Sequence, residues 1–396
     1  MINKFGSRGS YEIIRRLEEA GHEAVFVGGA VRDYLLGKPA KDIDIATSAE
    51  PDEVKAVFSN TVDVGVDHGT VLVIVEGEPI EVTTYRTEGT YTDHRRPDEV
   101  EFVKSLREDL LRRDFTMNAL ALTKDGELID LFGGRSDMKK KIIRAVGNPT
   151  DRFREDALRM VRAVRFSSVL DFDIEEMTLE SIQGNANQIS HVSIERLKIE
   201  MDKLFMGVNP GKAFTYLANS DLGTAIPLFS NQQEILERSL PFTNAVEGWA
   251  FFSVVGKFQP SEIARVYKLS NDERKFISSV HEAFKKRVTG QFTIDEYYTF
   301  DLAVLICTEK FYRSIYVNSP TLTDSELEER KKSLPIQSAQ DLAIDGKNLI
   351  EWAGITGGRW TGKWIEKIEH AVLHTLCENN PTKIKDWFMH DFKREK

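Results

Sequence analysis

The spacing of apolar residues changes near residue 150, and this change limits the folds open to the chain more than any other feature. Before it, short β-branched and aromatic runs are separated by turn signals such as Glu76-Gly77-Glu78-Pro79. From Asp151 onward, apolar residues recur every three or four positions, which is the period of an amphipathic helix. The sequence therefore predicts an α+β domain followed by a long all-helical part.

The first part contains several candidate strands, and we predict none after Asp151. Each is rich in β-branched or apolar residues, and turn-forming residues separate them. Because the chain has 396 residues, and a single hydrophobic core stops growing at about 250–300 residues, we expect more than one domain. The predicted strands cover residues 24–27, 42–46, 70–75, 80–85, 101–103, 119–123 and 128–130.

Composition excludes several classes of protein. Two distant cysteines, Cys307 and Cys377, exclude a disulfide framework and a cysteine-based zinc site, and they suit a reducing cytoplasm. No apolar run approaches the ~18–20 residues of a membrane helix, and the N-terminus lacks the pattern of a secretory signal. The net charge of −10 argues against a general DNA-coating protein, although residues 101–170 carry 15 Lys and Arg against 11 Asp and Glu. We therefore expect a cytoplasmic protein without a membrane partner.

A glycine pair, Gly28 and Gly29, follows the first predicted strand and opens a predicted helix. Glycines lack a Cβ, so a phosphate can approach their backbone N–H groups, and the start of a helix adds partial positive charge. Arg32 would reach the same phosphates with its planar fork of donors. A Gly-Gly turn before a helix is common, so this motif carries weight only together with others.

Asp42 and Asp44 fall on one face of the predicted strand at residues 42–46, because Ile43 and Ile45 take the other face. Two neighbouring carboxylates repel each other unless a cation lies between them, and Mg²⁺ combines one or two carboxylates with substrate phosphates. If the strand that carries Glu81 is close by, the three acids would hold two metal ions. The alternative is a solvated edge strand with exposed acids.

Two arginine-rich segments follow. The first segment is more polar than a segment leading into a buried strand needs to be. It reads Arg112-Arg113-Asp114-Phe115-Thr116-Met117-Asn118. In the second, read as one helix over residues 154–166, a polar stripe runs nearly opposite an apolar one. An all-arginine stripe led by one Asp indicates bidentate recognition of a flat or anionic ligand, and the alternative is an ordinary surface helix. The stripe consists of Asp156, Arg159, Arg162 and Arg165.

The order of these motifs resembles the bacterial class II tRNA nucleotidyltransferases, the CCA-adding enzymes of the DNA polymerase β-like superfamily. The resemblance covers residues 20–200 and includes Asp130-Leu131-Phe132-Gly133-Gly134, Glu155-Asp156-x-x-Arg159 and Glu195-Arg196-Leu197-Lys198-Ile199-Glu200. It implies a mixed-sheet nucleotidyltransferase head at residues 1–149, a helical neck at 150–210, a body at 211–320 and a tRNA-binding tail at 321–396.

The resemblance also implies an activity. The family adds CCA to the 3′ end of tRNA from CTP and ATP without a nucleic-acid template, depends on Mg²⁺, with a two-ion site, and releases pyrophosphate. The implied partners are tRNA, CTP and ATP, and the chain would be a monomer or a homodimer. By analogy, Asp42 and Asp44 bind the metals, with Glu81 as a third acid. The implied contacts to phosphates and ribose come from Gly29, Arg32, Arg113, Asp114 and Asn118, with Gly28 as structural support.

By the same analogy, Asp156 and Arg159 would read the incoming base, and Arg162 and Arg165 would support nucleotide binding. Cytosine and adenine both present an amine donor beside a ring-nitrogen acceptor, whereas uracil and guanine present the reverse. A carboxylate acceptor beside a guanidinium donor therefore suits C and A, because a mismatched base would leave buried groups unpaired. Glu195 and Arg196 would stabilise the neck helix that orients this pair.

Three alternatives stay open. Bacterial poly(A) polymerases share the head but carry a Gly-Arg-Arg-Phe…His-Val stretch, from which residues 64–73 depart. An enzyme that adds only A or only C is disfavoured by residues 86–97, a polar segment without a strand or helix pattern, because it matches the family's flexible loop. A non-catalytic RNA-binding protein is disfavoured by the intact acids, since carboxylates without a metal or base would only repel.

Two histidine motifs are not assigned a site. His370 and His374 have the i, i+4 spacing that can hold zinc on a helix, but no third ligand of the right kind is near them in the sequence. The pair His390-Asp391 lies too close to the C-terminus to form the metal site of a phosphohydrolase. The phenylalanines between residues 240 and 320 are interpreted as core residues rather than as a platform for stacked bases.

Overall fold

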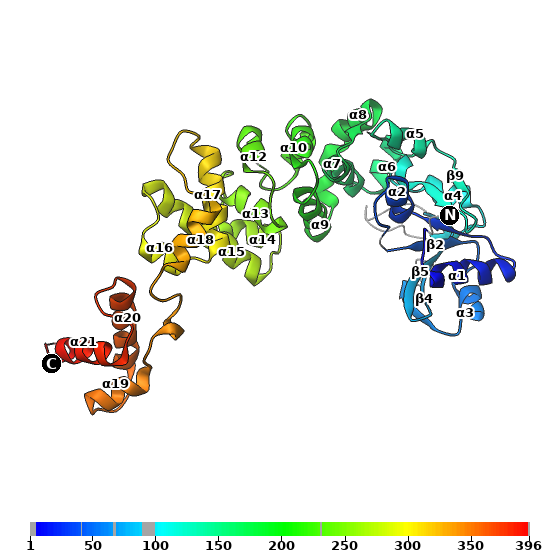
Figure 1. Ribbon diagram of the computed structural model, residues 1–396. Helices are drawn as coiled ribbons and strands as arrows, with labels where there is room; N and C mark the ends of the chain where they lie inside the picture. The colour runs from blue at the N-terminus through cyan, green and yellow to red at the C-terminus, as the bar shows by residue number, and fades with distance from the viewer. Residues whose placement is uncertain (1–4, 41, 66–68, 89–99, 230–231, 395–396) are drawn as a thin grey trace. The chain divides into compact units, whose positions relative to one another are not determined.

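The computed structural model describes residues 5–40, 42–65, 69–88, 100–229 and 232–394 (Figure 1). The chain divides into two compact units. The N-terminal unit consists of Met1–Gln233 and Thr243–Ala245, and the C-terminal unit consists of Glu234–Phe242 and Val246–Lys396. The boundaries between head, neck, body and tail stay predictions.

A mixed seven-stranded sheet forms the framework of the N-terminal unit, with strand order β3-β4-β5-β2-β1-β8-β9. Only the pair β2·β5 is parallel among these neighbours, so the α+β class and the mixed sheet are confirmed. The strands are β1 (Ala24–Val27), β2 (Asp44–Thr47), β3 (Thr61–Gly65), β4 (Thr70–Val75), β5 (Glu78–Thr84), β8 (Leu120–Leu122) and β9 (Leu128–Asp130).

The sheet is buried on both faces around β1, whose four residues are all buried. On one face, α1 (Arg8–Glu19) and α3 (Pro51–Val57) pack against β4 and its neighbours, as the blue helices of Figure 1 show. On the other face, Val25 and Val27 belong to a hydrophobic cluster with Leu110 and Val146. Because successive residues of a strand point to opposite faces, an entirely apolar β1 is placed in the middle of the sheet.

Two sequence predictions about local structure are wrong. The strand predicted at residues 42–46 begins only at Asp44, because Asp42 has a φ of 49° and lies outside it. The helix predicted over residues 154–166 is interrupted at Asp156, whose backbone is extended. There, the Asp156 carboxylate accepts a hydrogen bond of 3.1 Å from the backbone N–H of Leu158 and so caps the next helix.

Short strands account for the rest of the differences. The sequence did not indicate β3, β6 (Arg86–Glu88) or the parallel pair β10 (Ile142–Ile143) and β11 (Asp173–Ile174). The prediction of no strand after Asp151 is therefore wrong for β11, which is too short to show an alternating pattern. The strand predicted at 101–103 corresponds to β7 (Val100–Phe102), which pairs with β6.

The remaining helices of the N-terminal unit lie between the strands and after them in the chain, and some of them carry residues of the cleft described below. In Figure 1, α7 and α9 lie side by side, and they pack against each other. These helices are α2 (Gly29–Leu35), α4 (Leu106–Leu111), α5 (Gly134–Lys139), α6 (Pro149–Glu155), α7 (Leu158–Leu170), α8 (Glu176–Asn185), α9 (Ile194–Phe205), α10 (Pro210–Ala218) and α11 (Asp221–Ala225), with 3₁₀ turns η2 (Thr116–Asn118) and η3 (Ala186–His191).

The C-terminal unit is helical in its described residues. Phe251, Phe252 and Phe311 are fully buried in it, which supports their interpretation as core residues. No helix in the described part of the chain is both long enough and apolar enough to cross a membrane. The elements from residue 233 onward are α12 (Gln233–Ser239), α13 (Ala245–Val254), α14 (Pro260–Val266), α15 (Asn271–Thr289), α16 (Ile294–Thr299), α17 (Leu302–Ile315), α18 (Asp324–Lys332), η4 (Ala339–Asp341), α19 (Gly346–Ala353), α20 (Arg359–Leu373) and α21 (Pro381–Arg394).

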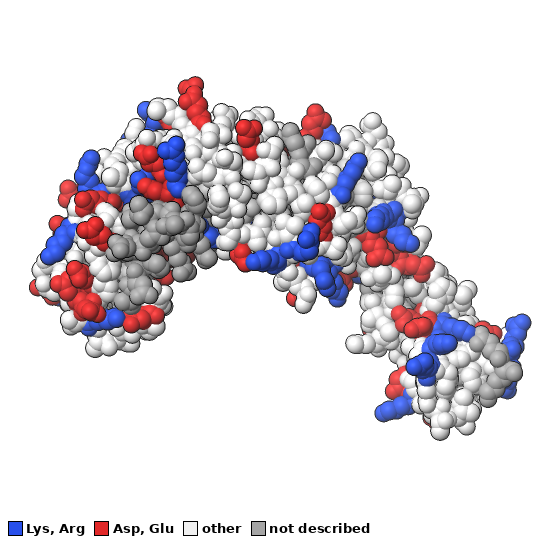
Figure 2. Space-filling view, turned by 180° about the vertical axis from the view of Figure 1, so that it is seen from behind, with Lys and Arg blue, Asp and Glu red and all other residues white. Residues whose placement is uncertain are grey.

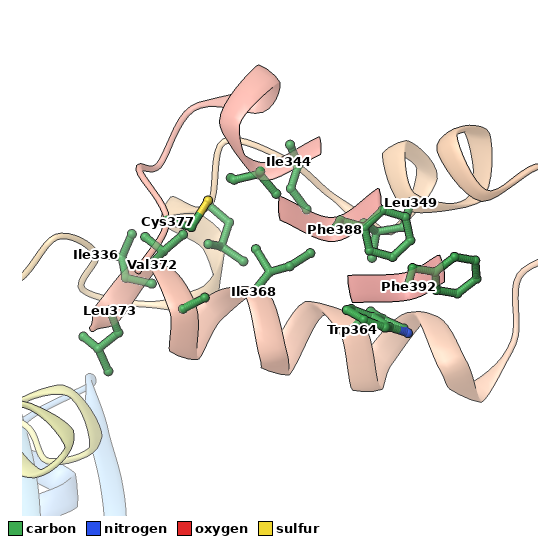
Figure 3. Packing of buried hydrophobic residues seen from close by; sticks show 13 residues of the cluster. Ile336, Ile344, Leu349, Trp364, Ile368, Val372, Leu373, Cys377, Phe388 and Phe392 are labelled. Carbon is green, nitrogen blue, oxygen red and sulfur yellow. The ribbon is translucent and has the colours of Figure 1, made fainter. Parts of the chain in front are cut away.

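The last three helices share a hydrophobic cluster of their own. Figure 3 shows Trp364 and Ile368 of α20 facing Phe388 of α21 and Leu349 of α19. Trp364 and Phe388 meet edge to face, with ring centroids 5.1 Å apart. The burial of Trp364, Ile368 and Val372 fixes which face of α20 points inward.

Surface charge is mixed. On the face drawn in Figure 2, the coloured Lys and Arg side chains lie among Asp and Glu side chains, without one continuous basic surface. A chain with a net charge of −10 therefore needs a local concentration of arginines to attract an anionic ligand.

Candidate active site

A cleft of about 350 Å³ lies in the N-terminal unit between the end of the sheet and the start of α7. The structure adds Arg112, Leu158 and Phe166 to the residues predicted from the sequence. Among the described residues, Asp42, Glu81, Arg165 and Glu195 are predicted site residues that do not line it. Those that do are Gly28, Gly29, Arg32, Asp44, Arg113, Asp114, Asn118, Asp156, Arg159, Arg162 and Arg196.

We call Asp42, Asp44 and Glu81 the acidic corner, and of these three Asp44 lines the cleft. Asp44 opens β2 and lies opposite Glu81 in the parallel register with β5. Burial, the charge of Glu81 and the charge of Asp42 raise the pKa of Asp44 to about 6, although Arg113 opposes them. Asp44 thus feels the charges of Glu81 and of Asp42, although Asp42 is outside the strand, and the role of the three acids as metal ligands stays a prediction.

The donor set of this corner fits a divalent cation with a preference for oxygen ligands. Asp42 and Glu81 are exposed and Asp44 is half-buried, so ions from solvent have access to each of them. Within the described residues, their carboxylate oxygens do not all approach within 4.8 Å of one another. A cation placed there would relieve the mutual repulsion that raises the pKa of Asp44.

The backbone conformation and the close packing at position 28 both favour glycine. Its φ of 78° lies in the left-handed region, which favours glycine. A Cβ at Gly28 would lie 3.2 Å from Nη1 of Arg113 and 3.5 Å from Oδ2 of Asp44. The glycine therefore lets the acidic corner and the Arg113 guanidinium share one wall of the cleft.

Asp114 connects the arginines along the floor. Its carboxylate accepts hydrogen bonds from Nδ2 of Asn118 at 2.8 Å and from Nε and Nη2 of Arg162 at 2.8 and 2.6 Å. Asn118 in turn accepts a 2.7 Å hydrogen bond from Nη1 of Arg32. Burial alone would raise the pKa of Asp114, but the Arg162 charge and these hydrogen bonds lower it to about 2. The chain of contacts fixes Arg32 and Arg162 relative to each other.

Phe166 and Glu200 contact arginines in and next to the cleft. Glu200 is buried and accepts a 2.8 Å hydrogen bond from Nε of Arg165. Cζ of Arg165 lies 3.4 Å from the centroid of the Phe166 ring, and Cζ of Arg32 lies 5.1 Å from it. Arg165 therefore packs behind the cleft, and burial lowers its pKa.

The predicted base-reading pair lies at the start of α7. Asp156 accepts a 2.6 Å hydrogen bond from Nη2 of Arg196, a residue predicted to stabilise the helix that orients the pair. Arg159 donates to Oε2 of Glu155 at 2.6 Å and to the backbone carbonyl of Arg112 at 2.9 Å. Both side chains are held in place on the cleft wall, one as an acceptor and one as a donor.

Sequence reasoning assigned no role to several residues that position the site. Glu155 and Glu200 lie inside motifs that the sequence analysis quoted, and each holds an arginine. Asp109 pairs with Arg112 at 2.8 Å and with Arg113 at 3.2 Å. The i, i+3 and i, i+4 spacing of Asp109 to these arginines was the available signal.

Two other predictions concern Glu195 and the segment 86–97. Glu195 is exposed in the first turn of α9, where a negative charge favours the helix dipole, and its predicted role stays a prediction. In the segment 86–97, Arg86–Glu88 forms β6, so the predicted lack of a strand is wrong for these residues. Residues 89–97 lie outside the described residues.

Three family models match successive parts of the chain. A poly A polymerase head domain matches residues 24–144. A probable RNA- and SrmB-binding site of polymerase A matches residues 171–232, and a putative tRNA nucleotidyltransferase domain 2 matches residues 240–388. The first match contains the acidic corner and most of the arginines before α7.

Curated relatives match over nearly the whole chain. A CCA-adding enzyme of Bacillus cytotoxicus is 42% identical over 381 residues, covering 95% of this chain and 96% of its own. A CCA-adding enzyme of Anoxybacillus flavithermus is 43% identical over 393 residues, covering 98% of each.

Solved structures agree with this result. The Bacillus stearothermophilus CCA-adding enzyme in complex with CTP has a TM-score of 0.86 and 37% identity, covering 100% of this chain and 99% of that one. The Thermotoga maritima CCA-adding enzyme complexed with tRNA has a TM-score of 0.67 at 22% identity, covering 96% of this chain and 94% of that one, and shows a likeness of fold.

Proposed function

This chain belongs to the CCA-adding enzymes, the bacterial tRNA nucleotidyltransferases, and we propose that the cleft between β2 and α7 is where it completes the 3′ end of tRNA. One observation carries the proposal: the acid Asp44 and the pair Asp156 and Arg159 line the same cleft, together with Arg32, Arg113 and Arg162. Metal binding, phosphate binding and base selection are thereby supported within one cavity.

Nucleotidyl transfer here joins the terminal ribose hydroxyl of tRNA to the α-phosphorus of CTP or ATP. The hydroxyl gives up its proton to solvent, and a bond forms between the 3′ oxygen and that phosphorus while the bond from the phosphorus to the pyrophosphate oxygen breaks. Asp44, with Asp42 and Glu81, would hold Mg²⁺, which when bound lowers the pKa of the attacking hydroxyl and neutralises phosphate charge. The leaving pyrophosphate gains negative charge, so Arg32 and Arg113 stabilise its departure.

Selection of the base falls to Asp156, just before α7, and to Arg159 in the first turn of α7. Arg196 holds the Asp156 carboxylate as an acceptor, and Glu155 holds the Arg159 guanidinium as a donor. Cytosine and adenine match this order of acceptor and donor, and uracil and guanine oppose it. Uracil or guanine would place its carbonyl against the Asp156 carboxylate and its N–H against the Arg159 guanidinium, so the hydrogen bonds made to C and A would be lost, which is costly.

The substrate classes also suggest a location. Transfer RNA, CTP and ATP are substrates of the cytoplasm, and the two cysteines are free thiols in the structure. We therefore propose a cytoplasmic enzyme.

Enzymes that add only A or only C would have the same cleft, so product length decides among them. A tRNA lacking its last three nucleotides is incubated with CTP, with ATP and with both. We expect two added residues with CTP alone, none with ATP alone and three with both. A ladder of added residues from ATP alone would indicate a poly(A) polymerase, and arrest after two residues with both nucleotides would indicate a C-adding enzyme.

A further inference from the structure

Asp295, His370 and His374 place three metal-ligating side chains together in the C-terminal unit. One ligand atom from each lies within 4.8 Å of the others. In the part of the chain that the structure describes, this is the one group of three or more His, Cys, Asp or Glu residues with such spacing. No third ligand lies near the two histidines in the sequence, and zinc was therefore not predicted. In the fold, Asp295 supplies that ligand, although it precedes His374 by 79 positions.

The two histidines are presented by a helix whose opposite face is fixed. Trp364, Ile368 and Val372 turn one side of α20 into the cluster shown in Figure 3. His370 is two residues beyond Ile368, a rotation of about 200°, so it lies on the outer face, and His374 follows one turn later. The two imidazole rings have centroids 4.2 Å apart and planes inclined by 32°.

The carboxylate comes from a separate helix. Asp295 lies in the first turn of α16, where a capping box between Thr293 and Glu296 fixes the helix start. Its Oδ1 lies 2.8 Å from Nε2 of His374. A second contact joins the same helices, because the Tyr298 hydroxyl donates to Oε1 of Glu369 at 2.5 Å. The ligands are thus held by two tethered helices.

These distances suit a tetrahedral ion. With bonds of about 2.0–2.1 Å, two ligand atoms of a tetrahedral zinc site lie about 3.3 Å apart, between the shortest contact of 2.8 Å and the limit of 4.8 Å. Asp295 and His370 are exposed and His374 is half-buried, so small rotations of the side chains would complete the geometry and an ion has access.

We propose that Asp295, His370 and His374 bind Zn²⁺, with water as the fourth ligand, and that the ion clips α16 to α20. Two imidazoles and one carboxylate favour zinc and similar transition metals, whereas Mg²⁺ prefers oxygen ligands. The site therefore differs in metal preference from the acidic corner of the cleft. The bound ion would join the segment from α19 to α21 to the preceding helices of the same unit.

Metal binding to the full-length chain tests the proposal. The chain is stripped with a chelator and titrated with Co²⁺, whose visible spectrum reports nitrogen ligands, and then with Zn²⁺ in competition. Excess Mg²⁺ is kept present to fill sites made of oxygen ligands alone. We expect one ion per chain, and a midpoint of thermal unfolding that rises with Zn²⁺.

Variants separate this site from chance binding. H370A and D295N are expected to weaken the affinity for Zn²⁺ at least about tenfold and to reduce the Zn²⁺-dependent rise of the unfolding midpoint accordingly. H390A is the matched control, because His390 is an exposed histidine that also lies beside an aspartate, Asp391, at 2.9 Å. Equal binding by H370A, D295N and the unchanged chain would overturn the proposal, as would no binding at micromolar Zn²⁺. Circular dichroism without metal checks that each variant is folded.

Discussion

Arg196 of α9 donates from Nη2 to Oδ2 of Asp156 across 2.6 Å and so fixes the carboxylate that caps α7. Each carboxylate oxygen of Asp156 therefore accepts one hydrogen bond: Oδ1 from the Leu158 backbone N–H and Oδ2 from Arg196. This arrangement links the orientation of a cleft residue to a helix that follows 40 residues later. Base selection in the proposed site thus depends on the packing of α9 against α7.

Replacing Arg196 with Ala should release Asp156 without removing it. We expect incorporation of UMP and GMP to rise relative to CMP, and kcat/KM for CTP to fall about tenfold, equivalent to about 1.4 kcal/mol. Steady-state incorporation of all four nucleotides measures both effects. K198A is the control, because Lys198 lies on the same helix and pairs with Asp202. Unchanged discrimination in R196A would contradict a positioning role.

Asp44→Asn should abolish nucleotide addition and leave tRNA binding intact, since it removes a charged ligand at nearly constant shape. Retained turnover would refute the assignment of the acidic corner. The pH dependence follows from the pKa of about 6. As the pH falls through 6, Asp44 takes up a proton, so turnover should fall, and a higher Mg²⁺ concentration should move that fall to lower pH.

The same pKa has a consequence for stability. Because the pKa of Asp44 is raised from 3.8 to about 6 in the folded chain, the folded state binds more protons between these values. Without divalent ions, Asp44 should therefore cost stability as the pH rises through this window, by about 1–3 kcal/mol at pH 7. Urea unfolding of D44N and the unchanged chain, with and without Mg²⁺, measures it. A D44N chain that is not more stable at pH 7 without Mg²⁺ contradicts the expectation.

Asp114→Asn should be strongly destabilising, because the half-buried Arg162 would lose the carboxylate that accepts two of its hydrogen bonds and would keep the more distant Glu200, at 3.5 Å. We expect a loss of about 3–5 kcal/mol in the free energy of unfolding. Since the pKa of Asp114 is lowered to about 2, its contribution is present above pH 3.8 and disappears as the pH falls through 2. The control is D125N at an exposed turn. Equal urea midpoints for the two variants would refute the role of Asp114.

Gly28→Ala tests the close approach on the cleft wall. The variant adds a Cβ at 3.2 Å from Nη1 of Arg113 and forces alanine to a φ of 78°. G126A separates these effects, because Gly126 has a φ of 86° with nothing within 4 Å of its added Cβ. Both variants should lose about 1–2 kcal/mol of stability from strain. Only G28A should raise the KM for CTP, by about tenfold if the contact costs about 1.4 kcal/mol. Equal KM values would exclude the contact.

The sequence predicted most of the sheet and many of the residues that line the cleft, because these have local signals. An all-apolar β1 and a Gly-Gly turn are visible in a few consecutive residues. Contacts between distant segments are different. The Asp109 and Glu200 ion pairs, the Phe166 ring beneath Arg165 and the meeting of Asp295 with two histidines depend on tertiary packing. The break at Asp156 was missed because helical periodicity continues across it, while its side chain caps α7.

Arg159→Ala tests base selection directly. Arg159 is 8% exposed and is held by Glu155, so its removal takes away the donor that opposes the hydrogen-bond pattern of uracil. We expect discrimination between CTP and UTP to fall by about 10²-fold, while binding of the triphosphate, which rests on Arg32 and Arg113, changes little. Competition between CTP and UTP measures discrimination, and inhibition by pyrophosphate reports on the phosphate site. R154A, an exposed arginine on α6, is the control. If R159A keeps the preference of the unchanged chain, Asp156 and Arg159 do not read the base.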